Sequence, residues 1–161
     1  MEFATVLVYI KSALVPLIIF GSLVLFTMIR GRRATTSLIL GLYFALLISL
    51  KFPYYERLNE IFGRMASSAT VSIIVFAVFT VIFSLLMDRL LFYRIDEGAF
   101  QGLGKKIFLS LLATILVMVY SYHVLPITNL VDPGVTASLL FSSNEYFFWW
   151  LIFPLFGLFF I

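Results

Sequence analysis

The stretch Met28–Thr36, MIRGRRATT, places three arginines and a glycine between two long apolar runs. Such a cluster of charge stands out, because only 12% of the 161 residues are charged while 63% are hydrophobic. A short basic segment between apolar runs is typical of a loop on the cytoplasmic side of a membrane, where Lys and Arg are in excess. The sequence therefore predicts a cytoplasmic hairpin between two transmembrane helices, and Arg30, Arg32 and Arg33 determine its side.

The composition indicates that most of the chain is surrounded by lipid. Its mean hydropathy is +1.12 and 18% of its residues are aromatic, whereas about a quarter of the residues of a soluble protein are charged. The net charge is +3 and the sequence pI is about 9.3. Since the basic residues flank apolar runs, we expect them to orient helices and attract anionic lipid headgroups of the bilayer. We expect no nucleic-acid partner.

The residue types that catalysis needs are scarce. The chain has no Cys and a single His, so a disulfide, a Cys-ligated metal or a multi-His metal site is excluded within one copy. The glycine-rich segment Gly98–Lys106 lacks the spacing of a phosphate-binding loop. No nucleophile with a base and an orienting group can be assembled. The sequence therefore predicts a protein that is not an enzyme, with no catalytic residues, no cofactor and no metal.

Five apolar segments divide the chain, at about 5–29, 35–50, 69–87, 107–127 and 146–161. Backbone groups in hydrocarbon must be hydrogen-bonded internally, so each segment is predicted to be a helix. The fifth, YFFWWLIFPLFGLFFI, is short and contains Pro154; it can span the membrane, re-enter it or dock on a partner. The predicted fold class is an all-α polytopic membrane protein with four transmembrane helices and a short fifth, in a single transmembrane domain over 1–161.

A short amphipathic helix is predicted at about 54–65, between the second and third segments. Leu58, Ile61, Phe62 and Met65 recur at helical spacing, with polar residues on the other faces. We interpret it as a connection that lies in the outer interface of the membrane. A gate or a partner-docking element is the alternative.

The loops between segments predict the orientation of the chain. Seven basic residues fall on one side of the predicted membrane and four on the other. The seven are Arg30, Arg32, Arg33, Arg89, Arg94, Lys105 and Lys106, and the four are Lys11, Lys51, Arg57 and Arg64. Because cytoplasmic loops carry the excess of Lys and Arg, we expect the N-terminus outside and the hairpin in the cytoplasm.

Small residues recur every fourth position along the second segment, at Ser37, Gly41, Ala45 and Ser49. This spacing lets two helix backbones approach closely, and packing is what drives helix association in lipid. The favoured interpretation is a contact with another helix of the same chain. A contact with a second copy is the alternative.

Thr80, Ser84 and Asp88 form a polar stripe on the third segment. Thr and Ser can hydrogen-bond to the carbonyl four residues earlier, whereas a carboxylate near hydrocarbon requires a cation or water. We expect Asp88 to lie at the membrane boundary, where Arg30, Arg32 or Arg33 can pair with it. A polar pathway for ions or protons along this stripe is the alternative.

Lys11 and His123 are two further polar residues that flank or interrupt apolar segments. A lysine stem can extend its ammonium group to the membrane surface, so we interpret Lys11 as an interfacial anchor. His123 lies in the segment YSYHVLP, and we interpret it as interfacial too, with a pH sensor or proton relay as the alternative.

The stretch LVLFTMIRGRRATTSLILGLYFALLISLKFPYYERL resembles the opening of the bacterial colicin V production protein family. In that family a first helix ends in an Arg-Gly-rich turn, and a second helix rich in small residues follows. SIIVFAVFTVIFSLLMDRLL, its basic loop and a helix ending in VLP resemble the rest of that family's core, over roughly Ile19–Pro126. The resemblance implies an inner-membrane protein linked to toxin production or export and to envelope maintenance. It implies no catalytic residues.

Three functions are consistent with these features. The first is a non-enzymatic accessory or assembly component in envelope transport or toxin export, located in the inner (plasma) membrane. The second is a small oligomeric channel or transporter, with Ser37, Gly41, Ala45 and Ser49 at the subunit contact. The third is an anchor subunit of a larger membrane complex. The expected partner is accordingly a second copy of the chain or another membrane-protein subunit.

Overall fold

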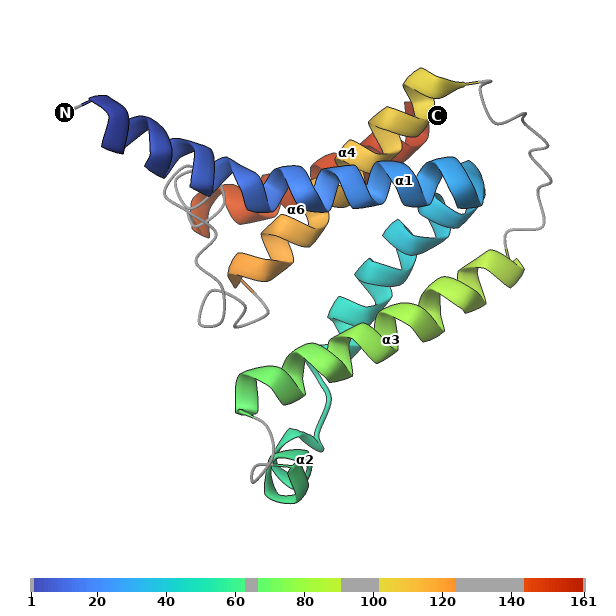
Figure 1. The fold of residues 1–161 in the computed structure, drawn as a ribbon. Coiled ribbons are helices and arrows are strands. Elements are labelled where there is room, and N and C mark those ends of the chain that lie inside the picture. The colour runs from blue at the N-terminus through green and yellow to red at the C-terminus, as the bar shows by residue number, and fades with distance from the viewer. Residues whose placement is uncertain (1, 63–66, 91–101, 124–143, 161) are drawn as a thin grey trace.

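The computed structural model describes residues 2–62, 67–90, 102–123 and 144–160, and the regular structure in these ranges is entirely helical. The helices are α1 (Glu2–Ser49), α2 (Tyr55–Phe62), α3 (Ser68–Leu90), α4 (Leu103–His123), α6 (Asn144–Gly157) and the 3-10 turn η2 (Leu158–Phe160) (Figure 1). The predicted all-α fold class is confirmed for these residues.

Three of the described helices are long and apolar enough to cross a membrane. They are Leu14–Ser49 within α1, Ser68–Leu90 of α3 and Leu103–Tyr122 of α4. The apolar stretch of α6, Tyr146–Gly157, is shorter. These lengths and compositions are compatible with a membrane location, and the two helices predicted at 5–29 and 35–50 are joined in the single element α1.

The chain turns sharply inside α1, at Gly31. Residues on both sides of Gly31 are helical, but Gly31 itself has φ 82° and ψ 175°. A positive φ is a conformation that glycine adopts readily and residues with a Cβ disfavour. Figure 1 shows the second half of α1 leaving the first at this point and running back across α3. The predicted hairpin therefore exists as a one-residue turn, shorter than the five-residue gap left between the predicted helices.

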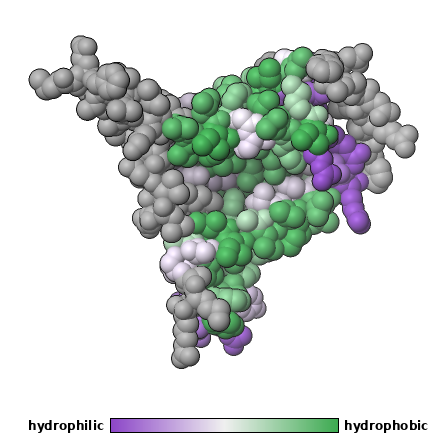
Figure 2. All heavy atoms as spheres, viewed as in Figure 1, coloured by the Kyte–Doolittle hydropathy of each residue, from purple (hydrophilic) through white to green (hydrophobic). Residues whose placement is uncertain are grey.

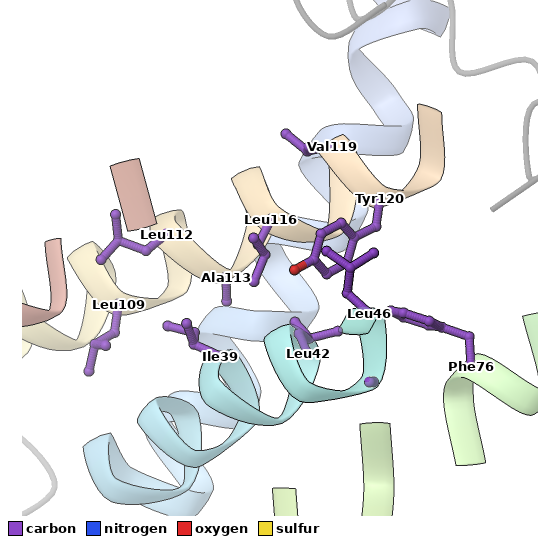
Figure 3. Packing of buried hydrophobic residues seen from close by; sticks show 11 residues of the cluster. Ile39, Leu42, Leu46, Phe76, Leu109, Leu112, Ala113, Leu116, Val119 and Tyr120 are labelled. Atoms are coloured by element: carbon purple, nitrogen blue, oxygen red, sulfur yellow. The ribbon is translucent and has the colours of Figure 1, made fainter. Parts of the chain in front are cut away.

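The core lies where the second half of α1 meets α4. Ile39, Leu42 and Leu46 of α1 point toward α4, and Phe76 reaches the same cluster from α3 (Figure 3). The α4 residues in this cluster are Leu109, Leu112, Ala113, Leu116, Val119 and Tyr120. Of the apolar span in α4, 56% is buried, compared with 11% in α3. α4 is therefore the central helix of the described part of the chain.

α4 begins four residues before the predicted boundary, and the rest of the predicted helix, 124–127, lies outside the described residues. Gly102 has φ 73°, and its carbonyl accepts a hydrogen bond from the backbone N–H of Lys106 at 3.0 Å. Lys105 and Lys106 thus lie in the first turn of α4, although the sequence placed them in the preceding loop. Lys106 is only 3% exposed. A hydropathy boundary marks where apolar residues start, whereas a helix starts where its backbone hydrogen bonds start.

α6 packs on α4 and also contacts α1. A Cβ at Gly157 would lie 2.6 Å from Leu112 Cδ1, so the α6 backbone is close to the side chain of Leu112. The Tyr43 hydroxyl of α1 donates a hydrogen bond to the Leu151 carbonyl of α6. The segment predicted at 146–161 is therefore a helix from Asn144 to Gly157 that is docked within this chain.

α2 lies at one end of the molecule and has no buried residue (Figure 1). Of its predicted apolar face, Ile61 is 68% exposed and Phe62 is 47% exposed, while Met65 lies outside the described residues. Tyr55 packs edge-on against Phe52 with ring centroids 5.1 Å apart, and partial burial raises the pKa of Tyr55. The predicted helix is present over Tyr55–Phe62, and Ile61 and Phe62 of its apolar face are exposed.

The outer surface of the described helices is mostly apolar, as Figure 2 shows for one face. Leu25 of α1, Leu85 of α3 and Trp149 of α6 are each more than 60% exposed. Apolar surface exposed to this extent is costly in water but matches a hydrocarbon solvent.

We expect Gly31→Ala to destabilise the protein by roughly 1–3 kcal/mol, since the φ and ψ of Gly31 fall in a region that residues with a Cβ hardly adopt. Unfolding of the purified protein by denaturant in detergent micelles measures the change. Gly21→Ala is the matched control, because a Cβ at Gly21 meets nothing within 4 Å and Gly21 lies inside a helix. Equal stability of the Gly31→Ala and Gly21→Ala variants would contradict the assigned turn.

Candidate functional site

A charged pair joins the turn of α1 to the end of α3. Arg33 Nε donates to Asp88 Oδ1 at 2.9 Å, and Arg33 Nη2 donates to the backbone carbonyl of Asp88. The two side chains are 36% and 46% exposed. The sequence predicted that Arg30, Arg32 or Arg33 can pair with Asp88. In the structure Arg33 pairs with it, and its guanidinium contacts both the carboxylate and the backbone carbonyl of Asp88. Asp88 thus lies at the helix end, next to a cation.

A buried cluster of hydroxyl groups joins three helix segments near the same turn. Thr27 Oγ1 lies 2.7 Å from Ser110 Oγ, and Thr35 Oγ1 donates to Thr27 Oγ1 at 3.0 Å. All three residues have 0% exposure. Thr27 precedes the turn, Thr35 follows it and Ser110 belongs to α4, so the cluster ties both halves of α1 to the central helix. Sequence analysis missed this cluster, because its members belong to no periodic pattern.

The small-residue stripe of α1 is buried inside the chain. Ser37, Ala45 and Ser49 are 1%, 0% and 7% exposed, and Gly41 is also buried. A Cβ at Gly41 would lie 2.7 Å from the backbone nitrogen of Ser84 and 2.9 Å from its Cα. α1 and α3 therefore approach each other at Gly41 as closely as the absence of a side chain permits.

The polar stripe of α3 consists of three residues with different surroundings. Thr80 donates to the Phe76 carbonyl at 2.9 Å and is buried. Asp88 pairs with Arg33. Between them, the Ser84 hydroxyl is buried against Gly41 without a hydrogen-bond partner. Ser84 and Asp88 line one pocket, but Thr80 does not, so the three residues do not form a continuous row that faces one space.

One pocket of about 370 Å³ lies between the two halves of α1 and α3. Arg30 and Asp88 lie at its charged end, and Ser37 of α1 and Ser84 of α3 line it further from that end. The remaining lining is apolar and includes Leu85. Figure 2 shows a hollow between the α1 and α3 regions, with hydrophilic atoms gathered at one end. Arg32 is 8% exposed and does not line this pocket.

Lys11, His123 and Tyr120 are polar or aromatic residues that lie in or beside apolar segments. The side chains of Lys11 and His123 lie outside the described residues. Tyr120, three residues before His123, is 1% exposed and packs edge-on against Phe76 at 5.7 Å. The interfacial interpretation of YSYHVLP concerned His123, and no sequence signal indicated that the Tyr120 ring is part of the core.

Among the described residues, no group of three His, Cys, Asp or Glu side chains lies close enough together to hold a metal ion. No family model, no curated protein and no solved structure matches this chain. The class of protein is therefore defined by the fold itself. The described part of the chain is all-helical and includes three helices of membrane-spanning length, joined by a close α1–α3 packing contact and by polar contacts around the Gly31 turn.

We expect Gly41→Ala to destabilise the protein by roughly 1–3 kcal/mol, the usual cost of inserting a methyl group into a tightly packed contact. Denaturant unfolding in micelles measures it, again with Gly21→Ala as control. Combining Gly41→Ala with Ser84→Ala should recover little stability, because the backbone of Ser84 lies within 3 Å of the new Cβ. Full recovery in the double variant would show that only the Ser84 hydroxyl opposes the methyl group.

Proposed function

We propose that this chain is a non-enzymatic accessory or assembly component in envelope transport, of the colicin V production type. The observation that supports the proposal is that polar groups of the described helices bind one another. Arg33 and Asp88 bind each other, and Thr27, Thr35 and Ser110 bind one another. Pumps and transporters instead direct such groups toward a substrate path at mid-depth.

The proposal includes a topology with four membrane crossings. The two halves of α1 meet at Gly31, and α3 and α4 are long enough to cross on their own. A chain with this order places Arg30, Arg33 and the end of α3 on the same side, which the Arg33–Asp88 contact supports. We propose that this side is cytoplasmic in the inner membrane, because it carries the excess of basic residues.

The alternative of an anchor subunit is supported by α6. Tyr146, Phe148 and Trp149 are all more than half exposed, although the opposite side of α6 packs on α4. Large aromatic residues are frequent at the centre of interfaces between proteins, and also at the lipid interface. Both the accessory component and the anchor subunit act through a partner, so one experiment addresses them together.

The first test is the native mass and composition of the tagged protein, extracted with its surrounding lipid from its own membrane. We expect a second, different membrane protein in fixed stoichiometry. Replacing Trp149 and Phe148 by Ala should weaken that association if α6 is the contact, whereas replacing the exposed Leu25 should not. A discrete homo-oligomer with nothing else bound would contradict the proposal and favour the channel.

A second test distinguishes an accessory component from a channel. It measures whether water reaches the polar stripe of α3. The chain contains no Cys, so Thr80→Cys, Ser84→Cys and Arg89→Cys each introduce the only thiol. We expect a membrane-impermeant maleimide to label Arg89→Cys, which is exposed at the helix end, and to leave Thr80→Cys and Ser84→Cys unlabelled. Labelling of both deep positions from the water phase would support a pore along α3.

A further inference from the structure

The pocket between α1 and α3 has one charged end and an apolar body. Its charged end is formed by Arg30 and Asp88, beside the point where α3 ends at Leu90. Val81 marks the other end, seven residues or about 10 Å along the helix from Asp88. The lining residues Val81 and Leu85 are 58% and 62% exposed, so the pocket opens sideways on the surface of the helices.

Within 2–62, 67–90, 102–123 and 144–160, Arg30 at this end has no acidic partner. Asp88 is engaged by Arg33 in a contact that holds both its carboxylate and its backbone carbonyl. Arg30 is exposed, and no ion pair recorded among the described residues includes it. An anion at the mouth of the pocket would therefore meet one available guanidinium, which is well suited to bind phosphate oxygens.

Two hydroxyl groups that line the pocket lack partners. Ser37 is 1% exposed, and neither Ser37 Oγ nor Ser84 Oγ has a hydrogen-bond partner. Other hydroxyls on these helices, such as Thr80 and Thr114, donate to the carbonyl four residues earlier. A buried hydroxyl without a partner is costly, particularly in lipid. A serine side chain needs only rotation about χ1 to direct its hydroxyl toward the pocket that it lines.

We infer that this pocket binds one anionic glycerophospholipid, and the inference does not depend on the proposed function. The phosphate lies against Arg30, the ester carbonyls accept hydrogen bonds from Ser37 and Ser84, and an acyl chain lies along Leu38, Val81 and Leu85. Ser84 is one helical turn, about 6 Å, deeper than Asp88, and the esters of a glycerophospholipid likewise follow its phosphate toward the hydrocarbon. The volume of about 370 Å³ lies within the range of about 300–1,000 Å³ that is common for ligand sites.

Native mass spectrometry of the detergent-purified protein, titrated with phosphatidylglycerol or phosphatidylcholine, tests this. We expect one phosphatidylglycerol to be retained in preference to phosphatidylcholine. Arg30→Gln should weaken phosphatidylglycerol binding by about fivefold, the effect of one basic residue near an anionic headgroup. Arg89→Gln is the matched control, because it removes one arginine charge next to Asp88 on α3 but Arg89 does not line this pocket. This variant should leave the retained lipid in place.

A second pair of variants tests the body of the pocket. Ala34→Phe fills it from α1 and should abolish retention of the lipid, whereas Val78→Phe places the same aromatic ring at an exposed site outside it and should not. Arg30→Gln changes only an exposed side chain, so it remains informative if Ala34→Phe does not fold. Equal binding of the two lipids, equal effects of Arg30→Gln and Arg89→Gln, or a dimer that Ala34→Phe dissociates would overturn the proposal.

Discussion

The turn at Gly31 is the constraint on which the rest of the structure depends. Thr27 and Thr35 are eight residues apart, which would separate them by about 12 Å along a straight helix, yet their hydroxyl oxygens are 3.0 Å apart. The turn also divides the long apolar span into two shorter helices. The 36 residues of Leu14–Ser49 would extend about 54 Å if straight, compared with a hydrocarbon core of about 30 Å. The same reversal places Arg33 beside the end of α3 and Ser110 beside both halves of α1.

Packing, more than polar contacts, holds these segments together. An interhelical hydrogen bond in lipid contributes only about 0.5–2 kcal/mol, and the Arg33–Asp88 pair is partly exposed, where such pairs contribute about 0–1 kcal/mol. The close approach of Gly41 to the Ser84 backbone and the apolar cluster around α4 involve many more atoms. The hydroxyl groups and the charged pair therefore act mainly to select which helix faces meet. Apolar surfaces resemble one another, so they cannot by themselves determine which helix faces meet.

Features that depend on a local pattern could be predicted from the sequence, whereas features that depend on how helices cross could not. The hairpin, the helical class and the small stripe of Ser37 to Ser49 are local patterns, and a local pattern is visible before the chain folds. The choice of Arg33 over Arg30, and the cluster of Thr27 with Ser110, depend on how the helices cross, which no spacing within one segment records. The start of α4 was misplaced because Lys105 and Lys106 were assigned to a loop by their charge. A lysine can occupy the first turn of a helix when its long stem lies along apolar neighbours.

The distribution of polar groups also limits where function can lie. A group whose hydrogen-bonding capacity is used within the protein has little left to offer a solute, and this holds for Thr80, Thr114 and the Arg33–Asp88 pair. Among the described residues, three groups that retain capacity are found together, while Asn59 Oδ1 and the Tyr120 hydroxyl, which also lack a partner, lie elsewhere. Arg30 and the hydroxyls of Ser37 and Ser84 line the same pocket, which opens toward the side of the helices and not along their axis. A path for ions requires polar groups in sequence across the membrane, whereas a lipid requires a cation at one end and apolar walls beyond it. The arrangement on α1 and α3 is of the second kind, and this asymmetry is why we place the chemistry of this chain at its lipid-facing surface.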